Sequence, residues 1–244
     1  MLIKACLNGG TTRAVHPSVP QTPGELAADA SAAVGAGAGA VHLHPRDASG
    51  AETLDADAVL AAVAAVRAAV PATPVGVTTG LWAAAGDPAR RMTLVSQWTG
   101  SEIPDFASVN VSEPGADDLA RLLDELGIAV EAGIWSADDA DRLAAGAFGR
   151  RVLRILIEPQ APEPQAAVAA AAAVEKALDR HGFTAPRLHH GYGVATWPVL
   201  RAAIRLGRDI RVGLEDTVVL EDGRPASGNS ELVQAAVRLA AEAR

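Results

Sequence analysis

Eight short apolar runs alternate along this chain with eight Ala-rich amphipathic stretches, and this alternation constrains the fold more than any other feature. The expected strands are residues 2–8, 40–44, 74–79, 106–111, 128–131, 152–158, 187–190 and 210–215. The expected helices are residues 23–35, 56–69, 88–98, 116–126, 137–147, 163–181, 195–205 and 229–243. Eight strand–helix units predict an α/β fold, a closed (β/α)8 TIM barrel with a parallel sheet. The alternative is a doubly wound open sheet, which usually has fewer strands.

Two of the expected helices begin with clear capping residues. Thr22 precedes a proline, and Glu25 follows Thr22 at the spacing of a capping box. Ser136, followed by two aspartates, opens the fifth helix in the same style. No Gly/Ser-rich or Pro-rich linker divides the chain, so we expect a single barrel domain over residues 1–244.

Composition narrows the class of protein. A net charge of −8 argues against nucleic acid or an anionic membrane as a partner, and 49% hydrophobic residues can fill a large core. The single cysteine, Cys6, lies in an apolar run and is expected to be buried and structural. The first residues run into a strand pattern without signal-peptide features, and no long uncharged apolar stretch suggests a membrane span. We therefore expect a cytoplasmic enzyme with a small-molecule substrate.

Polar side chains gather where the expected strands end, which is where barrel enzymes place their chemistry. They are Asn8, His42, His44, Thr78, Thr79, Asn110, Glu131, Glu158, His189, His190, Glu215 and Asp216. Polar groups at so many buried positions are costly for stability alone. Their placement predicts a polar pocket at one end of the barrel.

His42 and His44 form the clearest metal-binding pattern. Side chains alternate along a strand, so the two imidazoles share one face with Leu43 opposite. Histidine is the commonest neutral ligand for zinc, and catalytic zinc sites often add a carboxylate and leave one position open. A pair of core histidines held by hydrogen bonds is the alternative interpretation.

The missing carboxylate can come from the last strand, in the segment R-V-G-L-E-D. Arg211, Gly213 and Glu215 share one face, and the barrel closes with this strand beside the first. Glu215 can therefore approach the histidine pair, and Gly213 leaves room in the pocket. Asp216 is expected to turn toward the rim as a general base, oriented by Arg211 through charge-assisted hydrogen bonds.

The segments H-L-H-P-R-D and R-V-G-L-E-D, with T-P-G-E-L-A-A-D-A leading into A-G-A-G-A-V-H before the first of them, resemble the β-keto acid cleavage enzymes. These are zinc-dependent TIM barrels, and the similarity runs from about Lys4 to Val233. The resemblance implies that His42, His44 and Glu215 are metal ligands. It also implies that Asp216 is the catalytic base and Arg211 its partner.

Further site residues follow from the same resemblance. Thr79 and Asn110 fall where side chains bind the substrate carboxylate, and Glu131 matches an acidic catalytic residue at the end of the fifth strand. Asn8 and Arg46 are further substrate-binding candidates, although an ion pair between Arg46 and its neighbour Asp47 explains Arg46 equally well. His189 and His190 are interpreted as a packing or substrate-facing pair. The four tryptophans are interpreted mainly as packing or interface residues.

The reaction implied by the resemblance is an acyl exchange. A β-keto acid and acetyl-CoA, as co-substrate, give acetoacetate and a new CoA thioester, with Zn²⁺ or another divalent ion as cofactor. The family also implies a homo-oligomer, a tetramer or a dimer. Two segments depart from the family pattern: residues 111–115 form a shorter fourth loop, and Asn8 is followed by two glycines where some members carry an acid that binds an amino group.

Two other functions fit the same pattern. A metal-dependent hydrolase or aldolase-type lyase would use the same site with water or a simple aldehyde. A non-catalytic barrel would keep the fold as a binding module, although it would be expected to lose some of the site residues. Amidohydrolases carry their H-x-H motif on the first strand, whereas this motif is expected on the second.

Overall fold

Eight parallel strands close into one barrel in chain order in the computed structural model, which describes residues 1–242. The strands are β1 (Ile3–Cys6), β2 (Ala40–Leu43), β3 (Val75–Thr78), β4 (Phe106–Asn110), β5 (Ala129–Ile134), β6 (Arg154–Ile157), β7 (Arg187–His189) and β8 (Asp209–Val212). The pairing of β1 with β8, in which Lys4 lies opposite Arg211, closes the ring. The expected TIM barrel is confirmed.

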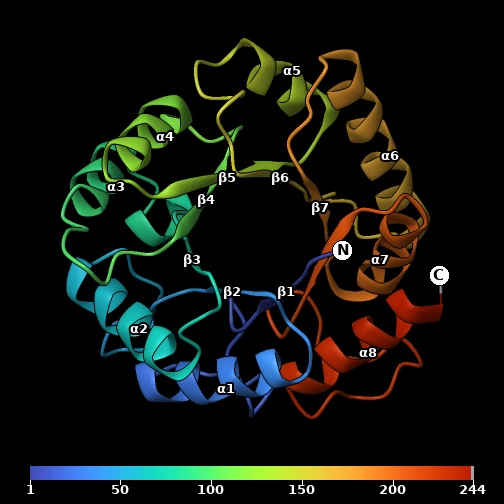
Figure 1. Cartoon of the computed structure of the whole chain (residues 1–244), viewed down its shortest axis with the longest axis horizontal. Helices are drawn as coiled ribbons and strands as arrows, with labels where there is room; N and C mark the ends of the chain where they lie inside the picture. The colour runs from blue at the N-terminus through green and yellow to red at the C-terminus, as the bar shows by residue number, and fades with distance from the viewer. Residues whose placement is uncertain (243–244) are drawn as a thin grey trace.

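The helices form a ring outside the barrel; α1 to α7 each lie between one strand and the next, and α8 follows β8 (Figure 1). They are α1 (Pro23–Gly35), α2 (Ala56–Ala69), α3 (Pro88–Val95), α4 (Ala116–Glu125), α5 (Ala137–Ala145), α6 (Pro164–Arg180), α7 (Thr196–Arg205) and α8 (Asn229–Glu242), with short 3₁₀ helices η1 (Leu81–Ala84) and η2 (Gly193–Ala195). The first two helices match the expected bounds, and the others end within a few residues of them. Ala243 of the expected last helix lies outside the described residues. Within residues 1–242, no helix is long and apolar enough to cross a membrane.

The capping residues act as expected. The Thr22 hydroxyl accepts from the Glu25 amide, and the Glu25 carboxylate accepts from the Thr22 amide, which completes the capping box of α1. Ser136 and Asp139 make the same reciprocal pair at the start of α5. These side chains bond backbone N–H groups that have no partner within the first turn of a helix.

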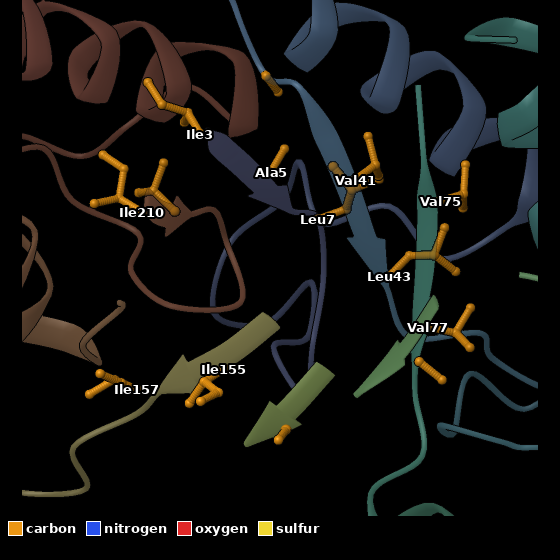
Figure 2. Close-up of a cluster of buried hydrophobic side chains, with 14 of the residues drawn as sticks. Ile3, Ala5, Leu7, Val41, Leu43, Val75, Val77, Ile155, Ile157 and Ile210 are labelled. Atoms are coloured by element: carbon orange, nitrogen blue, oxygen red, sulfur yellow. The ribbon is translucent and has the colours of Figure 1, made fainter. Parts of the chain in front are cut away.

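The main hydrophobic core lies between the sheet and the helices. Figure 2 shows apolar side chains from successive strands, including Ile3, Val41, Val75, Ile155 and Ile210, and all of these are buried. The residues between them in sequence point into the barrel. This alternation allows buried strands to carry polar residues such as Lys4, His42 and Arg211 between apolar ones.

The barrel interior below the site is partly ionic. Lys4 Nζ donates to Glu131 Oε2 at 2.5 Å, and Arg154 Nε lies 3.1 Å from the other Glu131 oxygen. The Phe106 ring lies between the two cations, 5.5 Å from Lys4 Nζ, and covers Gly76, where a side chain would clash with it. A fully buried carboxylate is tolerated here because two cations neutralise it.

Glu131 corrects one sequence expectation. We expected the fifth strand to end at Glu131, but β5 continues to Ile134, so Glu131 lies in mid-strand. The apolar residues after it continue the strand, and Lys4 and Arg154 supply the charge that permits an acid inside the barrel. Sequence pattern alone could not show those partners, because they come from β1 and β6.

Candidate metal centre and active site

His42, His44 and Glu215 converge at the carboxyl ends of the strands. His42 lies in β2 and His44 follows it, with ring centroids 5.2 Å apart. His42 Nε2 lies 3.9 Å from Glu215 Oε2, and His44 Nε2 lies 3.5 Å from Glu215 Oε1. One ligand atom from each residue lies within 4.8 Å of the others, a spacing that fits one metal ion.

Glu215 reaches this position from a turn, not from a strand. β8 ends at Val212, earlier than expected, and Gly213 begins the turn. The expected role of Gly213 is also corrected, because a Cβ there would lie 1.9 Å from the Cys6 carbonyl oxygen. Gly213 therefore allows the chain to approach β1 closely, and Asn229 at the start of α8 fixes the turn by accepting from the Leu214 amide at 2.7 Å.

Three residues hold His44 in place. Its Nδ1 lies 2.6 Å from Glu52 Oε2, which also accepts from Trp82 Nε1 at 2.7 Å. The Trp82 ring stacks on the imidazole at 6.2 Å. Asn8 donates to the His44 carbonyl at 2.8 Å and accepts from its amide at 2.9 Å. Asn8 thus positions a ligand residue, and a carboxylate behind a metal-binding histidine is a common support for such sites.

The electrostatics of the triad suit a cation. His42 Nδ1 and Glu215 Oε2 are buried and have no hydrogen-bond partner among the described residues. Burial holds the pKa of His42 well below its usual range, so its imidazole is neutral, the form that binds metals. Burial opposes the charge on His44, but Glu215 and Glu52 outweigh it and raise the His44 pKa to about 9. A cation between the rings and Glu215 would supply the partner that Glu215 Oε2 lacks.

A second group of buried ionisable residues adjoins the triad. One Arg211 nitrogen donates to Glu215 at 2.6 Å and to Asp216 at 2.7 Å. His190 lies between two acids, with Nδ1 3.2 Å from Asp216 and Nε2 3.4 Å from Glu158. Asp216 is buried at the end of this row and does not turn toward the rim as expected, because Arg211 and His190 draw it inward.

A cavity of about 230 Å³ opens beside these groups. Its lining residues come from seven strands, β2 to β8, and the loops that follow them: His42, His44, Thr78, Trp82, Ser108, Asn110, Trp135, Glu158, Gln160, Tyr192, Arg211 and Glu215. The pocket expected at this end of the barrel is therefore present. Asp216 lies behind Arg211 and is not among the lining residues.

The other expected site residues lie at different distances from this cavity. Asn110 lines it and donates to Glu113 at 2.9 Å. Thr78 lines it, whereas the neighbouring Thr79 donates to the Ser108 carbonyl at 2.5 Å and anchors the backbone. Arg46 donates to the carbonyls of Gly9, Thr11 and Gly50 and is not paired with Asp47. Glu131 belongs to the ionic interior of the barrel and not to the cavity wall.

Several residues that line or support the cavity were not predicted from the sequence as site residues. Glu52 was not singled out, and Trp82 and Trp135 were interpreted as packing residues although both line the cavity. His189 and His190 point to opposite sides of the barrel wall, since His189 bonds Glu175 of α6 at 2.8 Å. Trp135, Glu158, His190 and Tyr192 all follow or end a strand, and that position was the signal available in the sequence.

Comparisons with known proteins agree with this geometry. A family model described as beta-keto acid cleavage enzyme matches residues 1–244. The chain belongs to this family. Two curated relatives are each named 3-keto-5-aminohexanoate cleavage enzyme and are 26% identical over 99% of this chain and 92% of their own length. One is from Fusobacterium nucleatum subsp. nucleatum and the other from Acetoanaerobium sticklandii. The relationship identifies an enzyme that acts on β-keto acids.

Solved structures support the fold. The apo structure of ObcA superposes with a TM-score of 0.74 at 20% identity, covering 91% of this chain and 61% of ObcA. A ternary complex of ObcA with a C4-CoA adduct and oxalate gives a TM-score of 0.73. The present chain covers about three-fifths of the length of ObcA. Thiamine phosphate pyrophosphorylase from Pyrococcus furiosus shares the barrel at a TM-score of 0.61 and 12% identity.

Proposed function

We propose that this enzyme is a zinc-dependent acyltransferase that converts a β-keto acid and acetyl-CoA into acetoacetate and a new CoA thioester. One observation carries the proposal: the buried His42/His44/Glu215 triad lines one small cavity together with Arg211, which bonds Asp216 behind it. A solved complex of ObcA, which shares the fold, contains a C4-CoA adduct, and this supports the proposal that a CoA thioester takes part.

The exchange breaks one carbon–carbon bond and makes another. The bond between the keto carbon and the methylene carbon of the β-keto acid breaks, and the released acyl group joins the CoA sulfur. The carbon–sulfur bond of acetyl-CoA breaks, and its acetyl group joins the methylene carbon, which gives acetoacetate and frees the sulfur for the released acyl group. Atoms balance without water, and no redox cofactor is needed.

The residues of the chain would divide this task. His42, His44 and Glu215 would hold the metal ion, which when bound would act as a Lewis acid on the keto oxygen. Arg211 lines the cavity and would orient the substrate beside Asp216. Asp216 Oδ2 is buried and has no hydrogen-bond partner in the described chain, so it is the oxygen available to accept a proton.

The decisive experiment measures metal content and acyl transfer together. We expect about one divalent ion per chain in the purified enzyme, and loss of that ion in His42→Ala. We expect acetoacetate to form from a panel of β-keto acids only when acetyl-CoA is added. Turnover without acetyl-CoA would instead identify a hydrolase or lyase, and absence of both metal and turnover would identify a binding barrel.

We also propose an oligomeric state and a cellular location for the protein. The family resemblance supports a homotetramer in the cytoplasm. Sedimentation equilibrium measures the assembly directly, and a monomeric mass at micromolar concentration would contradict it. Fractionation of cells that express the tagged full chain tests the location.

A further inference from the structure

We infer that the β-keto acid taken by this cavity carries a short, uncharged acyl chain. The inference rests on the proposed acyl transfer and names the substrate class within it. It follows from three properties of the cavity wall: where its aromatic rings come from, how its charges are paired, and how much space it encloses.

Aromatic rings line the cavity from three separate loops. Trp82 follows β3, Trp135 follows β5 and Tyr192 follows β7. Both indole N–H groups are already engaged, Trp82 with Glu52 at 2.7 Å and Trp135 with Glu158 at 3.1 Å. The tryptophans therefore offer ring carbons and not hydrogen-bond donors to a bound molecule. Such surfaces favour an apolar group.

The charges on the cavity wall are already paired. Apart from the histidines, the charged lining residues are Glu158, Arg211 and Glu215. Arg211 bonds both Glu215 and Asp216, and Glu158 lies against Trp135 and His190. Among the described residues, Glu215 Oε2 and Arg211 Nε are the charged lining atoms without a hydrogen-bond partner, and Glu215 Oε2 faces the His42 ring. An ammonium or a second carboxylate on the acyl chain would lose its water in this cavity and gain at most one such atom in return.

The loop after β2 holds its cation outside the cavity lining. Arg46 is not a lining residue, and its two terminal nitrogens donate to the carbonyls of Gly9, Thr11 and Gly50. Asn8 uses its side chain on the backbone of His44 and Pro20. A charged acyl chain that extended toward this loop would therefore find no binding group there.

The lining residues of β3 and β4 suit the carboxylate that every β-keto acid has. Thr78 and Ser108 contribute hydroxyl groups, and Asn110 contributes an amide. Thr78 Oγ1 accepts from the Gly80 amide, which leaves its own O–H free to donate. Neutral donors can bind a carboxylate, whereas the aromatic wall is left for the acyl chain. The volume of about 230 Å³ is below the ~300 Å³ at which pockets for larger ligands begin, so the acyl chain must be short.

Three β-keto acids with the same six-carbon backbone test the inference: 3-oxohexanoate is neutral at its far end, 5-amino-3-oxohexanoate is cationic and 3-oxoadipate is anionic. We expect kcat/KM for 3-oxohexanoate to exceed both of the others by about tenfold or more. Calorimetric binding of the same compounds to the metal-loaded enzyme should give the same order. Equal or preferred binding of either charged compound overturns the inference.

Binding and turnover measurements test the substrate class and the acyl-transfer reaction separately. If the neutral compound binds best but acetyl-CoA-dependent turnover is absent, the acyl-transfer proposal fails and the substrate class stands. If all three are turned over with acetyl-CoA at equal efficiency, the reaction stands and the substrate class fails.

Tyr192→Ser tests the aromatic wall itself. Tyr192 is 38% exposed at the rim, so this variant should fold, and it changes no charge. We expect the preference for 3-oxohexanoate over 3-oxoadipate to fall about tenfold. The matched control is Leu206→Ser, an exposed apolar residue at the far end of α7, which should leave the preference unchanged. An unchanged preference in Tyr192→Ser contradicts contact between this ring and the acyl chain.

Discussion

The two ring nitrogens of His44 have separate tasks. Nδ1 is held by Glu52, and this contact turns Nε2 toward Glu215. Asn8 fixes the backbone on both sides of the same residue. The orientation of one ligand thus depends on a carboxylate eight residues later and on an amide from the β1 loop. Neither residue would bind the metal.

The Glu52 contact predicts a change in metal affinity. In Glu52→Gln the charge that holds His44 Nδ1 is lost, so we expect the enzyme to bind Zn²⁺ about 10–100-fold more weakly. Competition with a chromophoric chelator measures this directly. Glu102→Gln, at an exposed ion pair with Arg67, is the control and should bind Zn²⁺ like the unaltered enzyme. Equal Zn²⁺ affinity in both variants would show that Glu52 does not support metal binding.

His190 predicts an effect on turnover. It lies between Asp216 and Glu158, so His190→Asn should leave two buried acids without their shared cationic or donor partner. We expect kcat to fall about 10–100-fold, with a smaller change in KM, because His190 does not line the cavity. The surface variant His181→Asn should keep both constants. A variant with a raised KM and unchanged kcat would show that His190 acts on binding instead.

At the scale of elements, the site is assembled by short turns after the strands. The turn after β8 carries Glu215 and Asp216, and it passes so close to β1 that only glycine fits at position 213. The start of α8 secures the turn through Asn229, which also donates to the Leu7 carbonyl. One strand end, one turn and one helix start therefore fix Glu215, the third residue of the candidate metal site.

Gly213→Ala tests this arrangement. The added methyl group would collide with the Cys6 carbonyl, so the turn must shift, at a cost of about 1–3 kcal/mol in the free energy of unfolding. Metal affinity should fall with it, since Glu215 moves. Gly35→Ala in α1 is the matched control, because no atom lies near the added methyl group there. Urea unfolding and metal titration of both variants give the comparison, and unchanged affinity in Gly213→Ala would contradict the role of the turn.

At the scale of the whole molecule, ionic contacts secure both the interior and the outside of the barrel. Glu131 links β5 to Lys4 of β1 and Arg154 of β6 inside. On the outside, Glu175 of α6 bonds Arg187 and His189 of β7 and Arg208 before β8. Because β8 pairs with β1, the Glu175 contacts help to hold the strand at which the ring closes.

Glu175 predicts a pH-dependent stability. Burial opposes its ionisation, but hydrogen bonds from His189, Arg208 and Arg187 hold its pKa at about 2. A lowered carboxyl pKa stabilises the fold above the unfolded value of about 4.5, and this contribution is lost as pH falls toward 2. At pH 7, Glu175→Gln should cost about 2 kcal/mol in the free energy of unfolding. The two proteins should converge as pH falls from 4.5 to 2.

Urea unfolding at a series of pH values measures both curves. Asp118→Asn, which removes an exposed ion pair with Arg121, is the control and should follow the unaltered protein throughout. If the difference between Glu175→Gln and the unaltered protein were the same at pH 7 and pH 3, the carboxylate charge would not be the cause.

Sequence pattern determined the barrel because periodicity is local. Strand and helix periods, together with caps such as Thr22 and Ser136, depend on nearby residues, so the order of elements and most bounds could be predicted. The candidate metal triad could be predicted from the sequence for a related reason. The strand order of a closed barrel places β8 beside β1, so Glu215 could be assigned to His42 and His44 before any distance was known.

Only the tertiary structure decided how those residues are held and what surrounds them. Glu131 turned out to be a barrel-interior ion pair because its partners lie on β1 and β6, and Asp216 is buried because Arg211 and His190 draw it inward. The aromatic wall was likewise hidden, since Trp82 and Tyr192 lie more than 100 residues apart in the chain. Pairing, burial and cavity shape depend on atoms that are distant in sequence, whereas the fold class depends on a repeating local pattern.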